Sequence, residues 1–116
     1  MMNPTECAKA WKAVINIYNN TRDTSPEITM KHILDVFGIK KTKEIFATIA
    51  TIKEHDGRIY GANREYMKSV PVNPESVERV RGNPMLNAGL DDIHTTHINQ
   101  LITELRKVEK WKIYLR

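Results

Sequence analysis

The sequence predicts an all-α protein: a compact single-domain bundle of about four to six helices with an irregular mid-chain loop, occupying residues 1–116. Apolar residues recur at helical spacing in several segments, and proline, glycine and asparagine stand between those segments. No stretch alternates strictly between apolar and polar residues, as a half-buried strand would. At 116 residues, with 41% hydrophobic and 28% charged residues, the chain has the size and composition of one globular domain.

The first helix is expected to begin at Pro4 and to end near residues 19–21. Asn3 can cap this helix, and Pro4 suits its first position because that position needs no backbone N–H. The following apolar residues share one helical face and are expected to be buried: Cys7, Trp11, Val14, Ile15 and Tyr18.

Two further helices are expected on either side of Gly38, which is a natural left-handed helix end. Ser25-Pro26-Glu27 repeats the start signal of the first helix. The helix before Gly38 is expected to bury Met30, Ile33, Leu34 and Phe37. The helix after it, from about Lys40 to His55, is expected to bury Thr42, Ile45, Phe46, Ile49 and Ile52.

The middle of the chain is less regular. A short helix is expected over Asn63–Val70, where Pro71 ends it, and another begins at Asn73-Pro74-Glu75 and ends at Gly82. Residues 83–92 are expected to form an irregular loop. The last helix begins near His94 and runs nearly to the end, with a core face of Ile98, Leu101, Ile102, Leu105 and Val108.

Asp56, Gly57 and Arg58 are predicted to form a structural turn. Gly57 in left-handed geometry would end the preceding helix. A sharper interpretation has Asp56 and Arg58 anchor the mid-chain loop through an ion pair or carbonyl contacts. The glycine favours a structural role over ligand binding.

The single cysteine, Cys7, excludes an internal disulfide and favours a reducing compartment. The first residues lack the basic and then apolar pattern of a secretory signal, and no apolar run reaches the roughly 18–20 residues that cross a bilayer. We therefore expect a cytoplasmic protein without a membrane partner.

No phosphate-binding loop, dinucleotide-binding turn or nucleophile elbow occurs in the sequence. His94 and His97, one helical turn apart, could share a metal with His55. Structural roles are favoured instead, with His94 as a helix cap, His97 facing the core and Cys7 buried. We therefore predict that the protein is not an enzyme and has no catalytic residues, metal site or cofactor.

The net charge of +4 is concentrated at the end of the chain. Residues 1–105 carry 13 Lys/Arg and 13 Asp/Glu, whereas residues 106–116 carry five cations and one carboxylate. This basic C-terminal helix end or tail interleaves cations with aromatic residues, which suits phosphate contact with stacking or docking on an acidic protein. Its candidate binding residues are Arg106, Lys107, Lys110, Trp111, Lys112, Tyr114 and Arg116. The alternative is that these cations complement the helix dipole while Trp111 packs on the domain.

The segment from Met30 to Ala50 also permits a helix-turn-helix interpretation, because two helices meet at Gly38. Its second helix would expose Lys41, Lys43, Glu44 and Thr48, a weakly basic face. Glu44 would then stand where an apolar residue should be buried, which disfavours sequence-specific DNA binding.

The stretch from Ile28 to Val72 resembles an uncharacterised domain family of phages and integrative elements in Gram-positive bacteria. The features that carry the resemblance are Val36-Phe37-Gly38, the helix containing Ile49-Ala50-Thr51-Ile52-Lys53, Asp56-Gly57-Arg58-Ile59, Asn63, Ser69-Val70-Pro71-Val72, and downstream Asp92-Ile93-His94 with His97-Ile98. The resemblance implies a mobile-element setting and no defined activity. Small proteins in that setting are often accessory factors that act on host machinery, including anti-CRISPR inhibitors.

These observations predict a non-enzymatic mobile-element protein that binds and inhibits or modulates a bacterial protein or ribonucleoprotein, with anti-CRISPR counter-defence as the specific hypothesis. The alternative is a nucleic-acid-binding accessory protein that uses the basic end together with Lys40, Lys41 and Lys43. A metal-dependent enzyme built on His94, His97 and His55 is the third hypothesis. The sequence does not indicate an oligomeric state.

Overall fold

The first helix begins where the sequence predicts it. The structure is a computed structural model that describes residues 1–54, 59, 61–86 and 93–114, with no side chain described at 54 or 111–114. α1 spans Pro4–Thr21, and the side chain of Asn3 accepts a hydrogen bond from the backbone N–H of Glu6 at 2.8 Å. This bond satisfies one of the amides that an α-helix leaves free in its first turn.

α2 spans Pro26–Glu54 and is interrupted at Gly38, whose φ of 76° and ψ of 165° are not helical. Only glycine adopts this combination readily, because a Cβ atom would crowd the backbone. The two helices predicted on either side of Gly38 are therefore two arms of α2. The hydroxyl of Thr42 donates to the carbonyl of Gly38 at 2.7 Å and supports the start of the second arm.

Three more long helices follow α2 in the described chain. α3 spans Gly61–Lys68, α4 spans Pro74–Gly82 and α6 spans Thr95–Tyr114. Asn73 caps α4 through Glu75 N–H at 3.0 Å, as predicted. Residues 84–86 are also helical, so the prediction of an irregular loop over residues 83–92 is wrong for these three. No strand occurs in the described residues. The predicted all-α single domain of about four to six helices is confirmed.

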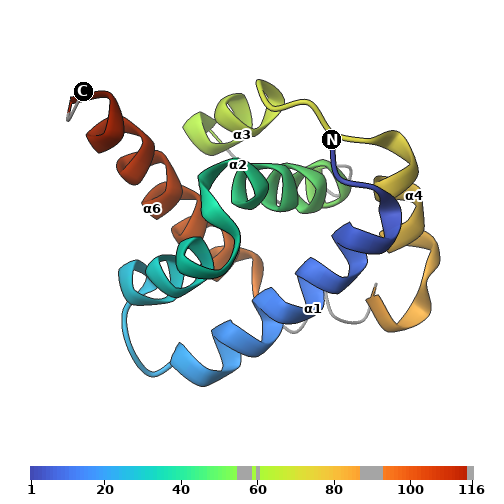
Figure 1. Ribbon diagram of the computed structural model, residues 1–116, viewed down its shortest axis with the longest axis horizontal. Coiled ribbons are helices and arrows are strands. Elements are labelled where there is room, and N and C mark those ends of the chain that lie inside the picture. The colour runs from blue at the N-terminus through green and yellow to red at the C-terminus, as the bar shows by residue number, and fades with distance from the viewer. Residues whose placement is uncertain (55–58, 60, 87–92, 115–116) are drawn as a thin grey trace.

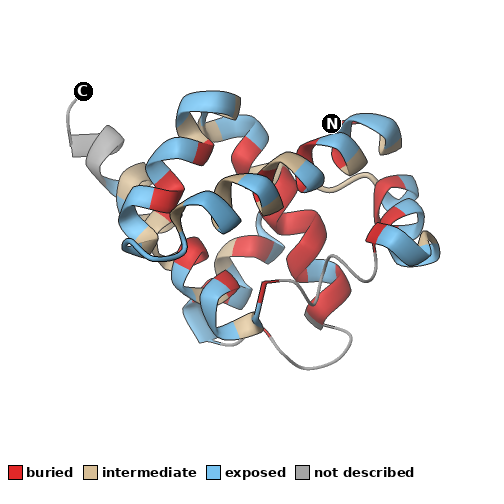
Figure 2. Ribbon diagram, turned by 90° about the horizontal axis from the view of Figure 1, so that it is seen from below, coloured by how far each residue is buried: buried red, intermediate tan, exposed pale blue. Residues whose placement is uncertain are grey.

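The core lies around the second arm of α2, which has other helices on several sides. α2 contacts α1, α3, α4 and α6 (Figure 1). Six consecutive residues, Ile45 to Ala50, are buried and belong to the red stretches of Figure 2. Trp11 from α1 meets Phe46 edge to face at 6.3 Å between ring centres, and both side chains are fully buried. The radius of gyration is 13.1 Å, as expected for a compact domain of about this length.

Most of the predicted core positions are confirmed, whereas five are only partly buried: Ile15, Tyr18, Leu34, Phe37 and Val108. The buried residues include Cys7, Trp11, Val14, Met30, Ile33, Thr42, Ile45, Phe46, Ile49, Ile52, Ile98, Leu101, Ile102 and Leu105. The expectation that Thr48 is exposed on a DNA-reading face is wrong, because Thr48 is only 4% exposed. It lies on a part of α2 that is covered nearly all round, and its hydroxyl donates to the carbonyl of Glu44.

None of the helices in the described residues combines the length and apolar character needed to cross a bilayer. The predicted turn of Asp56, Gly57 and Arg58 lies outside the described residues, as does most of the predicted 83–92 loop.

Candidate functional site

The predicted basic end of the chain is helical as far as Tyr114. α6 continues to Tyr114, so the backbones of Trp111, Lys112 and Tyr114 are helical, while their side chains and Arg116 lie outside the description. The other three predicted residues, Arg106, Lys107 and Lys110, line one groove of about 430 Å³. The structure therefore brings these three together, and it adds residues from α2 and α3.

A second hollow of about 410 Å³ adjoins the first and shares Lys43, Ser69 and Glu109 with it. It adds Lys40 and an apolar wall of Ile39, Val70 and Pro71. We call the two together the basic groove. It lies between the second arm of α2, α3 with the segment that follows it, and the last turns of α6.

Glu109 is the polar centre of the basic groove. Its carboxylate accepts a hydrogen bond from Lys43 Nζ at 2.7 Å and another from the hydroxyl of Tyr66. Burial opposes ionisation of Glu109, but these two bonds outweigh that effect and its pKa is lowered. Burial, and then the bond to Glu109, raise the pKa of Tyr66, so its hydroxyl stays protonated as a donor. Lys43 Nζ also lies 5.7 Å from the centre of the Tyr66 ring.

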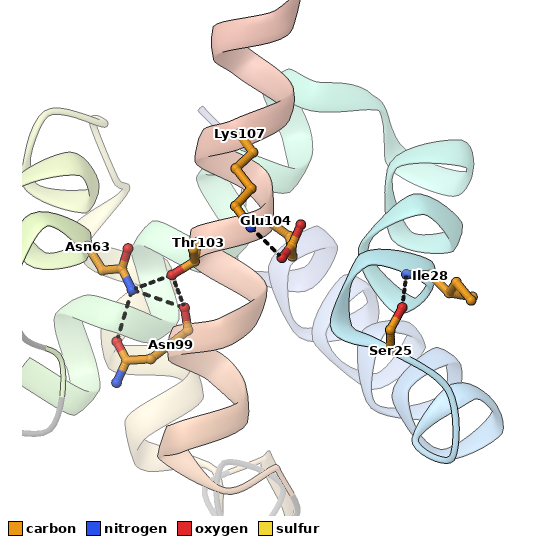
Figure 3. Close-up of polar contacts among 7 residues, drawn as sticks. All are labelled: Ser25, Ile28, Asn63, Asn99, Thr103, Glu104 and Lys107. Carbon is orange, nitrogen blue, oxygen red and sulfur yellow. Dashed lines mark hydrogen bonds and ion pairs between the residues drawn. The ribbon is translucent and has the colours of Figure 1, made fainter.

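Asn63 holds Arg106 in place from α3. Its amide nitrogen donates to the backbone carbonyl of Asn99 at 3.0 Å and to the hydroxyl of Thr103 at 3.2 Å (Figure 3). Its amide oxygen accepts from Arg106 Nη1 at 3.1 Å. Because this partner is a neutral amide, the hydrogen bond orients the guanidinium without cancelling its charge.

The groove keeps an excess of positive charge. Five cations line it, against the carboxylates of Glu44 and Glu109. Lys107 forms an ion pair with Glu104 at 3.2 Å, and Glu44 accepts the backbone N–H of Met2 at 2.9 Å. Within the described part of the chain, neither Lys40 nor Lys110 has an ion-pair partner. Such a surface can bind an anionic partner, with apolar and aromatic groups beside the cations.

The two histidines at the other end of α6 have different roles. His94 caps the helix, as predicted, through a bond from Thr96 N–H to Nδ1 at 3.2 Å. The prediction that His97 faces the core is wrong, because His97 is exposed and its Nδ1 lies 2.5 Å from the hydroxyl of Tyr18. It occupies the outer side of the first turn, while Ile98 takes the buried position beside it.

Candidate metal ligands do not gather in the described residues, where no three His, Cys, Asp or Glu side chains are placed to hold an ion. His55 lies outside those residues. Cys7 is buried, as predicted, at 1% exposure, and burial raises the pKa of its thiol. An inaccessible thiol of raised pKa is a poor nucleophile.

Sequence reasoning found the cations of the groove but missed Asn63, Tyr66 and Glu109 as their partners. Lys40 and Lys43 were singled out only in the nucleic-acid alternative and, for Lys43, in the helix-turn-helix interpretation. One signal was present, because Asn99, Thr103 and Arg106 recur at helical spacing along α6 and so share a polar stripe. That α3 supplies Asn63 to this stripe depends on a tertiary contact that spacing does not encode.

The structure is thus an all-α domain that carries a basic groove between α2, α3 and α6. The chain belongs to a family described as a protein of unknown function (DUF3849), whose model matches residues 2–110. The predicted resemblance to an uncharacterised domain family is thus confirmed, over more of the chain than the motifs covered. No curated protein and no solved structure matches the chain.

Proposed function

We propose that this protein is a non-enzymatic accessory factor that binds a bacterial macromolecular target through the basic groove and inhibits or modulates it. In its specific form, the proposal is an anti-CRISPR-type protein of a phage or integrative element, whose target is a protein or ribonucleoprotein in the cytoplasm. The mobile-element setting comes from the resemblance of the sequence motifs. The assignment of the binding surface comes from the groove.

The observation that carries the proposal is the composition of the groove. It places Arg106, Lys107 and Lys110 beside the Tyr66 ring and the apolar wall around Val70. Arginine and aromatic residues are frequent anchors in interfaces, and unpaired lysines favour association with an acidic surface. Most of these residues stand on helices, so their backbone needs no ordering on binding, and only the exposed side chains lose freedom. The inhibitory step would be steric, since a rigid face of this size can cover a docking or nucleic-acid-binding surface.

The uncompensated charges of Lys40, Arg106 and Lys110 favour one second candidate, a nucleic-acid-binding accessory protein. Phosphate contacts release counterions, so this candidate predicts an affinity that falls steeply as salt rises. With three such contacts on a single strand, the slope of log K against log salt would be about −2. Affinity that changes little between low and moderate salt would exclude it.

The test is capture of partners from a lysate of the host bacterium with the tagged protein, with and without nuclease, analysed by mass spectrometry. A Lys107→Glu/Lys110→Glu variant is compared with a Lys9→Glu/Lys12→Glu variant, which changes the same charge at exposed sites of α1. We expect one protein partner that survives nuclease, is kept by the α1 variant and is lost by the groove variant. A partner kept equally by both variants would contradict the assignment to the groove, and nuclease-sensitive capture alone would favour the second candidate.

A further inference from the structure

A separate small pocket lies at the opposite end of α6 from the basic groove. It forms where the last turn of α1, the start of α2 and the first turns of α6 meet. Its volume is about 160 Å³. Thr29 and Leu101, both buried, lie at its base, and the more exposed side chains of Tyr18, Arg22 and His97 stand around it.

The hydroxyls nearest the base of the pocket are already engaged. Thr21 donates to the carbonyl of Ile17 at 2.7 Å, so the Thr29 hydroxyl, 2.7 Å from Thr21 Oγ1, is the donor of that pair. Thr24 donates to the carbonyl of Thr21 at 2.5 Å. These bonds fix the threonines as part of the wall and leave them no hydrogen to offer a ligand.

The remaining side chains have hydrogens to donate. Ser25 Oγ accepts from Ile28 N–H at 3.3 Å, which leaves its own hydrogen free (Figure 3). The Tyr18 hydroxyl and His97 Nδ1 lie 2.5 Å apart and form one hydrogen bond. If the hydroxyl donates to Nδ1, the neutral imidazole keeps its Nε2–H as a donor. If Nδ1–H donates to the hydroxyl oxygen, the hydroxyl keeps its own hydrogen as a donor. Gln100 adds an amide, and Arg22 adds a guanidinium that has no ion pair within the described chain.

The pocket therefore combines many donors with positive charge. None of its described lining residues is an aspartate or glutamate. Asp23 and Glu27 are close in sequence, but both are exposed and neither lines the pocket. A donor-rich site with a guanidinium and no carboxylate matches an anion with several oxygen acceptors.

Its size limits the choice of anion. The pocket has room for about five water molecules at roughly 30 Å³ each, and it is smaller than the roughly 300–1,000 Å³ of sites that enclose drug-sized ligands. A whole nucleotide does not fit inside. One tetrahedral phosphate group does.

We propose that this pocket binds a single phosphate group, either as inorganic phosphate or as the monoester of a small ligand whose remainder stays in solvent. Arg22 supplies the charge, while Ser25, Gln100 and the Tyr18–His97 pair supply hydrogen bonds to the phosphate oxygens. The site is independent of the proposed target binding, because none of its residues lines the basic groove.

The experiment is a titration of the full chain with inorganic phosphate and, separately, with O-phosphoserine, followed by two-dimensional NMR of the backbone amides. Chloride keeps the ionic strength and a non-coordinating buffer keeps the pH constant. We expect saturable shifts centred on residues 22–29 and 95–101. Arg22→Gln should weaken binding about tenfold or more, because it removes charge-assisted bonds, and His97→Leu should weaken it less.

Two controls separate this site from general anion effects. Lys12→Gln removes an exposed α1 charge outside the pocket, and Lys107→Gln/Lys110→Gln removes two charges from the groove. Both should keep wild-type affinity for phosphate. Shifts spread over all exposed cations without saturation, or equal binding by folded Arg22→Gln and wild-type protein, would overturn the proposal. Stronger binding of O-phosphoserine than of phosphate would identify a monoester as the ligand, and the reverse would identify the free ion.

Discussion

The two arms of α2 are similar in sequence pattern and very different in surroundings. The first arm, before Gly38, buries Met30 and Ile33 but leaves Ile28 and Val36 43% and 62% exposed. The second arm, after Gly38, buries every residue from 45 to 50. Both arms have an apolar stripe at helical spacing, but only the second is enclosed on several sides. An apolar stripe therefore identifies one buried face and does not show whether the opposite face is also covered.

The difference matters for function because the second arm carries Lys40 and Lys43 into the basic groove. A helix held on several sides keeps its backbone in place, so the points from which its side chains extend are fixed, as a preformed binding surface requires. The first arm contributes Pro26 and Thr29 to the small pocket for which phosphate binding is proposed, and it is otherwise more open to solvent. Changes in the two arms should therefore have unequal effects.

The largest expected effect is from Phe46→Ala in the second arm. Phe46 is fully buried against Trp11, so its removal should lower the free energy of unfolding by about 3–5 kcal/mol. Phe37→Ala in the first arm should cost only about 1 kcal/mol, because a half-buried ring has less transfer free energy to lose. Urea unfolding followed by circular dichroism measures both. Equal losses would show that the two arms are equally enclosed.

The next effect is from Gly38→Ala, at the junction between the arms. A Cβ atom there would meet nothing within 4 Å, so the cost is that of the backbone conformation alone, about 1–3 kcal/mol. Gly82→Ala, which also meets nothing within 4 Å but has no positive φ, should be neutral or stabilise by up to about 1 kcal/mol. The same urea series provides the measurement. A neutral Gly38→Ala would mean that the junction relaxes to ordinary helix.

Much of the division of the chain into helices, including the two arms of α2, could be predicted from the sequence, because it depends on local chemistry. Caps at Asn3, Asn73 and His94 and the break at Gly38 follow from residue types that favour a particular backbone geometry. Five buried positions of the second arm follow from spacing, namely Thr42, Ile45, Phe46, Ile49 and Ile52. Spacing does not predict the burial of Ala47, Thr48, Ala50 and Lys53. Their burial depends on how many helices surround α2, which is a property of the whole fold.

The groove could be predicted only as far as its charges. Arg106, Lys107 and Lys110 stood out because the charge excess is local in sequence. Asn63 and Tyr66 did not, because polar residues of a short helix give no sign of what they will meet. His97 was assigned to the wrong side because it stands one helical turn before the buried Leu101, and spacing does not show whether the first turn of that stripe is covered.

A smaller effect is expected from Glu109→Gln, which breaks the ion pair between α6 and Lys43 of the second arm. The pair is partly exposed, so at pH 7 the loss should be at most about 1 kcal/mol. Because the pKa of folded Glu109 lies below the ordinary value of about 4.3, its carboxylate stabilises the fold above that pH. This contribution disappears as the pH falls through the folded-state pKa.

The free energies of unfolding of Glu109→Gln and wild type should therefore be compared at pH 7 and at a pH well below the folded-state pKa of Glu109, where the difference should vanish. Glu78→Gln is the matched control, because it breaks an i,i+3 pair with Arg81 in which the Glu78 side chain is 68% exposed. Its effect should be close to zero at both pH values. A difference between Glu109→Gln and wild type that persists at the lower pH would show that the substitution disturbs packing and not only charge.

The smallest effect is expected from Val36→Thr on the open side of the first arm. Valine and threonine have nearly the same shape, and Val36 is 62% exposed. The free energy of unfolding should therefore change by less than about 0.5 kcal/mol. The same substitution at Val80, which is fully buried in α4, should cost about 1–3 kcal/mol because a hydroxyl leaves water. Both variants are measured at two protein concentrations tenfold apart. If Val36→Thr cost as much as Val80→Thr and the loss grew with concentration, the open face of the first arm would be covered by a second molecule, and the contrast between the arms would hold for the isolated chain alone.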